Sequence, residues 1–457
     1  MSTISTNPPA GMRDFGPAEL CARRHVENVI RDVFEAHGFV EIETPAVENL
    51  STLLGKYGEE GDQLLFRLLH RRDKLSRALE GKPAEKDLAE TGLRYDLTVP
   101  LARFIANNAA TLPRFFKRYQ IQPVWRADRP GKGRFREFCQ CDVDITGTSS
   151  LLAEADICNA VAMTLSRLGL TNVAIHLNHR CLLRGLIAAS GITAGHEESA
   201  LVAVDKLDKI NEDGVLKELD TRGITPESGR KLLEVLRRPD GLTEVAELDR
   251  LRTALASNEE AVKSIDELRQ LLEVAADSMA GPLFKIDASL ARGLGYYTGP
   301  IFEIRAADIK GSLGGGGRYD NLIGMFSNRS IPAVGFSIGF ERLILVLEER
   351  KLMPPLMTGP EVLLCRFAEV PAAGILRIAN LLRQAGLRIE VYPETPKIGK
   401  QLGYAESIHV KVAAMLGEDE LKAGNITLKN LASGEQVTVT LGAAASMITG
   451  WLGKTPL

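Results

Sequence analysis

The stretch PVWRADRPGKGRFREFCQCDVDI, residues 123 to 145, holds side chains suited to a ligand of mixed charge. Its cations fall between residues 126 and 136 and are followed by uncharged and acidic residues; the polar members are Arg126, Arg129, Lys132, Arg134, Arg136, Gln140, Asp142 and Asp144. In an extended chain alternate side chains point to opposite faces, so the even positions from 134 onward would form one polar face that runs from cationic to anionic. The odd positions are largely apolar.

Such a face suits a ligand with a phosphate at one end and an ammonium at the other. Arg126, on the incoming strand, is predicted to face the same surface across the hairpin. Taken alone, however, a charged hairpin fits a solvated face with cross-strand ion pairs better.

Two glycine-rich segments add candidate residues. LARGLGYYTGPIFEI, residues 290 to 304, sets Arg292 among glycines and close to Tyr296 and Tyr297. Glycine permits a close approach to a ligand, tyrosines offer flat walls with hydroxyl groups, and arginine is permanently charged, although a tyrosine pair alone is more often packing. GGGGRYD, residues 314 to 320, lacks the endings of a P-loop or a dinucleotide fold and indicates a close-packed turn or a substrate wall.

Three further side chains have both a functional and a plain interpretation. Arg342 falls near the start of a predicted helix, where free N–H groups favour anions, but from its position alone an ion pair with a nearby glutamate explains it better. Asp96 and Thr98 in RYDLTVP are predicted on one strand face as an anchor for an amine. A salt bridge with Arg94 or Arg103 would explain Asp96 as well. The histidines are isolated, which argues against a nucleophile triad or a metal cluster.

Composition sets the outer limits. The chain has 457 residues, 45% hydrophobic and 25% charged, as expected for a soluble protein of about two or three domains. A net charge of -3 means that any nucleic-acid binding must rest on local basic patches. No apolar run approaches the roughly 20 residues that cross a bilayer and the N-terminus has no apolar signal core, so a cytoplasmic protein with reduced cysteines is predicted.

The predicted elements form a core in two parts. Residues 18 to 37 have helical apolar spacing, and FVEIETPAVE follows as a strand whose Pro45 belongs at an edge, an end or a bulge. Residues 118 to 145 are predicted as two strands around a loop, after an exposed polar stretch at 71 to 92. AVGFSIGFERLILVLEE, a strand that turns into a helix, closes the core near residue 350.

The remaining segments are predicted as separate modules. Residues 180 to 280 are almost purely helical and indicate an insertion into the core. Residues 351 to 359 form a proline-punctuated linker, and residues 360 to 457 alternate strand and helix patterns as a small α/β domain would.

Together these motifs resemble the histidyl-tRNA synthetases, class II aminoacyl-tRNA synthetases, over essentially the whole chain. IETPAVE is similar to the first class II motif, residues 123 to 145 to the second, and GFSIGFERLILVLEE to the third. LARGLGYYTGPIFEI and GGGGRYD resemble the two histidine-specific motifs, and RYDLTVP resembles the strand of the histidine pocket. The C-terminal segment from IHVKVAAML onward resembles the anticodon-binding domain of the family.

The resemblance implies an α+β fold with an antiparallel six-stranded sheet flanked by helices. The core would comprise residues 1 to 179 and 281 to 350, with the helical insertion between them and a C-terminal α/β anticodon-binding domain. It also implies a homodimer, formed partly through the first motif, and a two-step reaction. Histidine and ATP would give histidyl-adenylate and pyrophosphate, and the 3′ end of tRNA(His) would then take the histidyl group. Mg²⁺ would arrive with ATP, without a tightly bound metal.

The resemblance also implies roles for the candidate residues. Arg126 and Arg292 would flank the α-phosphate and act in catalysis, and Arg126, Arg134 and Arg342 would bind ATP. Histidine would be held by Asp96, Thr98, Gln140, Asp144, Tyr296 and Tyr297. The tRNA acceptor end would meet Arg129 and Lys132. Gly295 stands where the family often has Asp or Ser, and so removes a polar side chain beside the pocket.

Two alternatives remain from the sequence. The first is a non-catalytic relative that senses histidine or uncharged tRNA; such a regulatory subunit typically lacks the tRNA-binding domain and the catalytic arginines, whereas this chain has Arg126, Arg292, Arg342 and the C-terminal module. The second is a class II synthetase for another amino acid, which the histidine-specific motifs oppose. An active ligase is therefore predicted.

Overall fold

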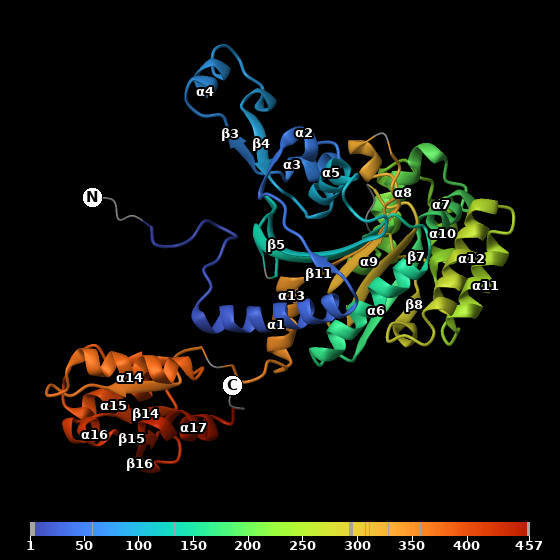
Figure 1. Ribbon diagram of the computed structural model, residues 1–457. Coiled ribbons are helices and arrows are strands. Elements are labelled where there is room, and N and C mark those ends of the chain that lie inside the picture. Colours follow the sequence, from blue (N-terminus) through green and yellow to red (C-terminus); the bar gives the residue numbers. More distant parts are fainter. Residues whose placement is uncertain are drawn as a thin grey trace. The chain divides into compact units, whose positions relative to one another are not determined.

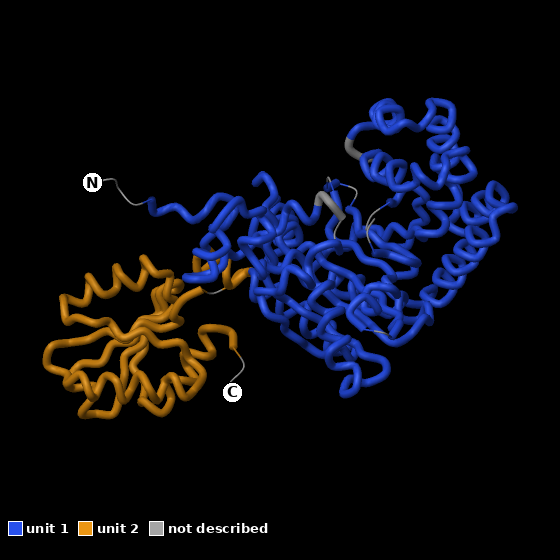
Figure 2. Tube along the Cα trace, turned by 90° about the horizontal axis from the view of Figure 1, so that it is seen from above, with its two compact units in different colours: residues 1–14, 23–353 blue, residues 15–22, 354–457 orange. Residues whose placement is uncertain are grey.

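The computed structural model describes residues 5–56, 58–131, 133–291, 296–306, 308–309, 311–327, 329–356 and 358–454. The chain divides into two compact units (Figure 2). The first comprises Met1–Asp14 and Arg23–Met353, and the second comprises Phe15–Ala22 and Pro354–Leu457. Within the described ranges, no helix has both the length and the apolar character needed to traverse a bilayer.

The first unit is built on an eight-stranded sheet in the order β1-β5-β6-β11-β10-β9-β7-β8. Adjacent strands among the six inner ones are antiparallel to one another, which confirms the predicted antiparallel sheet. The outermost strands β1 and β8 are added in parallel. The strands in sheet order are β1 (Val40–Glu41), β5 (Phe116–Trp125), β6 (Glu137–Thr146), β11 (Ala333–Gly339), β10 (Gly314–Arg318), β9 (Pro300–Ala306), β7 (Val173–His179) and β8 (Phe284–Ile286).

Three helices cover the apolar face of this sheet (Figure 1): α1 (Pro17–Ala36), α6 (Leu152–Arg167) and α13 (Phe340–Glu349). The odd-numbered residues of β6, including Cys141 and Val143, share one buried cluster with Val26 of α1 and Leu343 of α13. Their burial removes a large apolar area from water and fixes which face of the sheet is turned away from the helices. The even-numbered polar residues of β6 therefore lie on the opposite face.

The segment before β5 departs from the prediction of one continuous strand. FVEIETPAVE forms two short strands, and the backbone N–H of Thr44 between them donates to the Gln122 side chain at 3.1 Å. Since proline cannot donate to a strand ladder, a break before Pro45 is expected. A second sheet, β2-β4-β3, follows with short helices: β2 (Val47–Asn49), α2 (Leu50–Leu53), α3 (Gly58–Gln63), β3 (Arg67–Leu69), α4 (Arg72–Ala78), η1 (Glu85–Asp87), β4 (Ala89–Leu93) and α5 (Thr98–Asn108).

A group of helices lies between β7 and β8 in the sequence, although the two strands are paired in the sheet (Figure 1). Three of them begin at residues whose side chains accept a hydrogen bond from a backbone N–H three positions later, namely Thr225, Thr243 and Asn258. Such N-caps satisfy donors that the first helical turn leaves unpaired. The helices are α7 (Arg180–Ala189), η2 (Ala194–His196), α8 (Glu197–Val204), α9 (Leu207–Thr221), α10 (Pro226–Leu236), α11 (Glu244–Ala254), α12 (Glu259–Val274) and η3 (Gly281–Leu283); η4 (Ile323–Phe326) follows β10.

The second unit has its own core around a five-stranded sheet in the order β13-β12-β14-β15-β16. The first three strands of that order are parallel and the last two are added antiparallel. Its elements are β12 (Val362–Cys365), α14 (Ala372–Gln384), β13 (Ile389–Val391), α15 (Ile398–Ser407), β14 (Val412–Met415), α16 (Glu418–Ala423), β15 (Asn425–Asn430), β16 (Gln436–Thr440) and α17 (Leu441–Leu452).

Candidate active site

The polar face of the hairpin strand β6 is buried. Gln140 is 9% exposed, and Asp142 and Asp144 are each 2% exposed. The alternation predicted from the sequence is therefore confirmed, whereas a solvated face is wrong for these three residues. Asp142 lies opposite Gln120 of β5 on one side and Ser337 of β11 on the other.

The glycine-rich segment lies beside this face as strand β10, so the alternative of a close-packed turn is wrong. Gly315 is paired with Ser337, and Gly317 with Gly335. A Cβ on Gly335 would lie 1.9 Å from Asp144 Oδ1, and a Cβ on Gly317 would lie 3.1 Å from Tyr297 Cδ1. The glycines let polar and aromatic side chains approach the sheet closely, because a larger residue would occupy the same space.

Asp144 is bound by two residues that the sequence analysis did not select. Its Oδ2 lies 2.7 Å from Arg118 Nη2, and Arg118 is fully buried on β5. The Tyr319 hydroxyl donates a hydrogen bond to Asp144 Oδ1. Burial raises the pKa of Asp144, while the Arg118 charge and the Tyr319 hydrogen bond oppose that rise. Arg118 was identifiable in principle, because it stands directly across the hairpin from Asp144.

Asp142 is a third residue absent from the predicted site. Burial raises the pKa of its carboxyl to about 7; nearby Asp144 and Asp96 add to the rise, and Arg118 opposes it. Gln140 Nε2 donates to Ser337 Oγ at 2.9 Å and lies 3.5 Å from Asp142 Oδ1. The alternation of β6 already placed Asp142 on the polar face, so its position between two selected residues was the available signal.

The paired tyrosines form an aromatic wall near these carboxylates. The ring centroids of Tyr296 and Tyr297 lie 4.8 Å apart, edge to face, and Tyr296 meets Tyr319 in the same manner at 6.1 Å. Burial raises the pKa of both Tyr296 and Tyr297, and the negative charges of Asp96 and Asp142 contribute in each case. The structure thus brings the predicted tyrosines, Gln140 and Asp144 into one region.

Asp96 and Thr98 do not share a strand face, contrary to the prediction. Strand β4 ends at Leu93, and Thr98 is the first residue of α5. Asp96 is buried and its Oδ1 accepts a hydrogen bond from the backbone N–H of Val99 at 3.2 Å. An aspartate in this position satisfies a donor of the first helical turn, which favours a helix start over a longer strand.

Arg94 and Arg103, which were considered as ion-pair partners of Asp96, both contact other residues. Arg103 forms an ion pair with Glu48 at 2.6 Å. Arg94 is buried and donates to the carbonyl oxygens of Thr44 and Pro123.

Arg126 lies at the cationic end of the polar face, next to Phe138. Its guanidinium carbon is 4.3 Å from the Tyr95 ring centroid and 5.1 Å from that of Phe138, and its Nε donates to the Tyr95 carbonyl at 3.2 Å. Stacking on two rings restricts the side chain while leaving its charge. Phe138 is an even position of β6, so Arg126 lies on the side of the sheet that was predicted.

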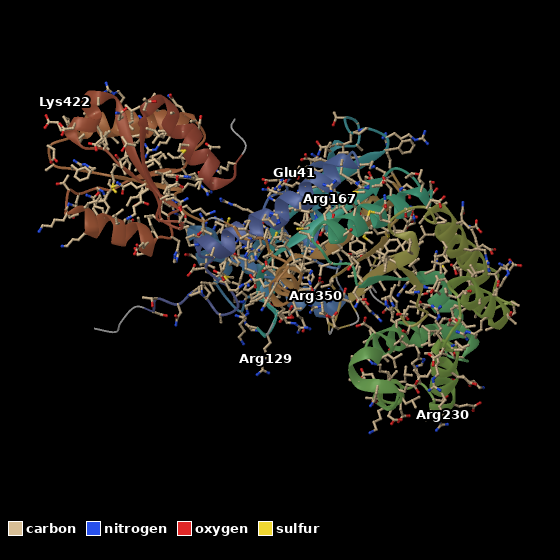
Figure 3. The ribbon with its side chains drawn as sticks, turned by 90° about the horizontal axis from the view of Figure 1, so that it is seen from below. Glu41, Arg129, Arg167, Arg230, Arg350 and Lys422 are labelled. Carbon is tan, nitrogen blue, oxygen red and sulfur yellow. The ribbon has the colours of Figure 1, made fainter. Side chains whose placement is uncertain are left out.

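Two described cations of the hairpin loop, Arg129 and Arg134, are exposed to solvent. Arg129 is exposed and projects from the surface in Figure 3. The Arg134 side chain is 67% exposed and lies 3.9 Å from Asp128. Lys132, Arg292 and Gly295 lie outside the described residues.

Arg342 lies in the first turn of α13, where its Nη1 donates to the Ser312 carbonyl at 2.6 Å. The adjacent Glu341 points elsewhere, to Arg23 at 2.7 Å and to the backbone N–H of Cys139 at 3.1 Å. Ser312 also lines a cavity of about 930 Å³ over β7 and β9.

That cavity has charged walls. His176 and Arg305 both contact Asp287, at 2.9 Å and 3.2 Å, and Arg305 also pairs with Glu303. Burial raises the pKa of Asp287, but hydrogen bonds from His176 and Ser289 and the Arg305 charge together lower it to about 2. His176 and Glu303 are directly paired, and Glu303 is paired with Gly315, so the cavity and the polar face of β6 lie on the same side of the sheet.

The first unit has a six-stranded antiparallel sheet, the charged hairpin β5–β6, and strand β11 leading into helix α13 with Arg342. This is the catalytic architecture of a class II aminoacyl-tRNA synthetase. The family model described as histidyl-tRNA synthetase matches residues 11–343, and that of an anticodon binding domain matches residues 372–451. The chain therefore belongs to the histidyl-tRNA synthetase family.

Individual relatives agree with this assignment. The histidine–tRNA ligase of Porphyromonas gingivalis is 44% identical over 445 residues, covering 95% of this chain and 97% of the relative. That of Cytophaga hutchinsonii is also 44% identical and covers 94% and 97%. The crystal structure of histidyl-tRNA synthetase from Nostoc sp. PCC 7120 superposes with a TM-score of 0.80 at 31% identity, over 98% of this chain and all of that one.

A further solved structure is described as an ATP phosphoribosyltransferase regulatory subunit/histidyl-tRNA synthetase, from Bacillus halodurans. It has a TM-score of 0.71 and 21% identity, and covers 88% of this chain and 97% of that one. At this identity the likeness shows the shared fold alone.

Proposed function

We propose that the protein is an active histidine–tRNA ligase that uses the buried face of β6 to bind histidine and ATP end to end. The observation that carries this proposal is the gradient along one strand face, from Arg126 stacked at Phe138 to the carboxylates Asp142 and Asp144. Membership of the histidyl-tRNA synthetase family supports histidine as the amino acid.

In the first step, a carboxylate oxygen of histidine attacks the α-phosphorus of ATP, and the bond to the pyrophosphate leaving group breaks. Arg126 is positioned to stabilise the negative charge that develops on the phosphate oxygens. The family motif assigns the same task to Arg292. Arg342 and Arg134 would bind the outer phosphates, and the helix N-terminus that carries Arg342 favours anions as well.

Histidine would be held between the aromatic wall and the acidic end of the face. Tyr296 and Tyr297 would contact the imidazole, and Gln140, Asp96 and Thr98 would receive the polar groups around the α-carbon. Because Asp144 is bound by Arg118 and Tyr319, we propose that it acts by fixing Tyr319 against Tyr296 rather than as the main partner of the substrate. No protein nucleophile is needed, because the substrate carboxylate attacks directly.

In the second step, the 3′-terminal ribose hydroxyl of tRNA(His) attacks the carbonyl carbon of the adenylate, and AMP leaves. Arg129, which is exposed, and Lys132 would bind the acceptor end, since cations commonly contact nucleic-acid phosphates. The second unit would bind the anticodon, as supported by the family match over residues 372–451.

Three further features belong to this proposal. Mg²⁺ would accompany the ATP phosphates, as it usually does, because it keeps several waters and needs few protein ligands. The protein would work in the cytoplasm, where tRNA is charged for translation. It would form a homodimer partly through the first motif, and the exposed Val40 on edge strand β1 and Val47 on β2 support contact with another surface.

The deciding experiment is amino-acid-dependent exchange of pyrophosphate into ATP, measured with a panel of amino acids and followed by charging of tRNA(His). We expect exchange with histidine alone and transfer to tRNA. Histidine binding without exchange would instead identify a regulatory relative, and exchange with another amino acid would identify a different synthetase.

A further inference from the structure

The chain segment before helix α1 lies against the hairpin that carries Arg126. The carbonyl oxygen of Gly11 accepts the backbone N–H of Arg136 at 2.8 Å, and the carbonyl oxygen of Arg136 accepts the backbone N–H of Arg126 at 2.9 Å. The Arg136 side chain extends this connection into the hairpin loop, because its Nε donates to the Asp128 carbonyl at 3.0 Å. Gly11 is therefore joined through one residue both to Arg126 and to the loop.

Glycine is required at position 11 by its backbone and by its surroundings. Its φ is +82°, in the left-handed region that residues with a Cβ rarely adopt. A Cβ there would also lie 2.8 Å from Arg136 Cγ and 3.0 Å from Pro130 Cγ. A larger residue would therefore press against both the returning strand of the hairpin and its loop.

Arg13 contacts the same hairpin through its side chain. Its guanidinium carbon lies 3.4 Å from the centroid of the Phe135 ring, as in a close cation–π contact. Arg13 also forms an ion pair with Glu341, which directly precedes Arg342 in α13. Glu341 in turn accepts the backbone N–H of Cys139 at 3.1 Å. Arg13 thus joins the hairpin to the helix that carries Arg342.

Glu341 is firmly held at this junction. It is 6% exposed, and Arg23 of α1 donates to its two carboxylate oxygens at 2.8 Å and 2.7 Å. Burial raises the pKa of Glu341, but the hydrogen bonds from Arg23 and Arg13 outweigh that effect and lower the pKa. The carboxylate is therefore a charged, fixed anchor for Arg13.

We propose that Gly11 and Arg13 are positioning residues for the activation of histidine. They hold Arg136 and Phe135, and through them the hairpin that bears Arg126, in the arrangement that binds ATP. They act through Arg126 and not on the reacting atoms. The proposal rests on the proposed function, because it assigns to the N-terminal segment the ordering of the ATP-binding hairpin in that reaction.

Loss of this positioning has a distinct kinetic effect. If the hairpin adopts the ATP-binding arrangement for only a fraction of the time, the apparent affinity for ATP falls by that fraction. Saturating ATP restores the arrangement, so kcat changes little. A segment that only stabilised the fold would behave differently, because its loss would lower the amount of active protein, and hence kcat, without changing KM.

The test is histidine-dependent pyrophosphate exchange by the full-length protein, with ATP and histidine varied in turn. For Arg13→Ala we expect KM for ATP to rise by about 3- to 10-fold, while kcat and KM for histidine stay within about 2-fold. Gly11→Ala should raise KM for ATP as well, since its Cβ would displace Arg136. Arg24→Ala, which removes an exposed arginine of α1, is the matched control and should leave all three constants unchanged.

A spectroscopic measurement reports on the hairpin itself. Trp125 directly precedes Arg126, and its Nε1 donates to Glu137 Oε2 at 2.8 Å, across the hairpin. The other tryptophan of the chain, Trp451, lies in the second unit. In a Trp451→Phe background, acrylamide should quench the fluorescence of Trp125 more strongly when Arg13 is replaced by alanine. Saturating ATP should remove this difference.

Three results would overturn the proposal. They are a lower kcat of Arg13→Ala with unchanged KM for ATP, equal rises in KM for ATP and for histidine, and equal quenching of Trp125 with and without the Arg13 side chain. If the unaltered protein showed no histidine-dependent exchange, the proposed function would fail instead. The quenching of Trp125 with and without ATP would then still decide whether the segment positions the hairpin.

Discussion

At the scale of single residues, Asp142 and Asp144 occupy the same face of one strand but have different surroundings. Asp144 has an arginine at 2.7 Å and a tyrosine hydroxyl as partners. Asp142 has the uncharged Gln140 and Ser337 as hydrogen-bonding neighbours, and its pKa is about 7. A buried carboxylate without a matched cation is unfavourable for the free protein, and such cost is typical of binding sites.

The first prediction concerns this cost. The pKa of Asp142 rises from about 3.9 in the unfolded chain to about 7 in the folded protein, so the folded state binds the proton more tightly. The resulting stability is fully present below about pH 4 and is lost as the pH rises toward 7, by up to about 1.4 kcal/mol per pH unit. Urea unfolding between pH 5 and 8 should show that Asp142→Asn removes this contribution from the slope. An identical slope in both proteins would argue against a buried, titrating Asp142.

The second prediction concerns Arg126. Arg126→Ala should reduce histidine-dependent pyrophosphate exchange by about 10²- to 10³-fold, because a preorganised charge at the transferred phosphate is lost. The thermal unfolding midpoint should change little, since the guanidinium stacks on rings at a partly exposed position. Arg167→Ala, an exposed arginine near the end of α6 (Figure 3), is the control and should retain exchange. Near-normal exchange in Arg126→Ala would remove this residue from catalysis.

At the scale of elements, the glycines of β10 and β11 show how positions without a side chain shape a site. Their paired glycines bring Asp144 and Tyr297 against the sheet, whereas a residue with a Cβ would displace them. Strand β10 is also tied to α6 by Arg318, which forms a buried ion pair with Glu154 at 2.6 Å. Close packing on one face and an ion pair at the end fix the strand that lies between β9 and β11.

The third prediction tests this packing. In Gly335→Ala the new Cβ would lie 1.9 Å from Asp144 Oδ1, so the carboxylate must move away from its partners. Overpacking of this kind costs about 1–3 kcal/mol, and the affinity for histidine should fall as well. Gly403→Ala, within helix α15 and with nothing within 4 Å of the added Cβ, should instead stabilise the protein by about 0.5–1 kcal/mol. Denaturant unfolding of both variants gives the comparison, and equal effects would refute the packing argument.

At the scale of the whole molecule, the two units have separate hydrophobic cores, one around the eight-stranded sheet and one around the five-stranded sheet. All described residues of the candidate site belong to the first unit. Activation of histidine and recognition of the anticodon would therefore depend on different cores.

The fourth prediction separates these two tasks. Deletion of residues 360 to 457 should reduce charging of tRNA(His) far more than histidine-dependent exchange, because the activation site remains in the first unit. Circular dichroism and a cooperative thermal transition check that the shortened protein folds. Equal loss of both activities in a folded shortened protein would mean that the second unit mainly supports the first.

The sequence by itself determined several elements and the polar face of β6. Alternation predicted the polar face of residues 134 to 145, and helical spacing predicted α1. Both features follow from local periodicity, because successive residues of a strand or a helix point in fixed directions. The six-stranded antiparallel sheet was expected from the resemblance to the class II synthetases.

Only the tertiary structure decided which polar residues are paired with the protein and which remain for a ligand. Asp144 is bound by Tyr319, 175 positions later in the chain, and by Arg118 across the hairpin, whereas Asp142, two residues away, keeps its place beside an unsatisfied acceptor. Asp96 likewise became a helix-capping residue rather than a strand residue. Periodicity specifies the direction of a side chain, but its partners, its burial and therefore its pKa depend on segments that meet only when the chain folds.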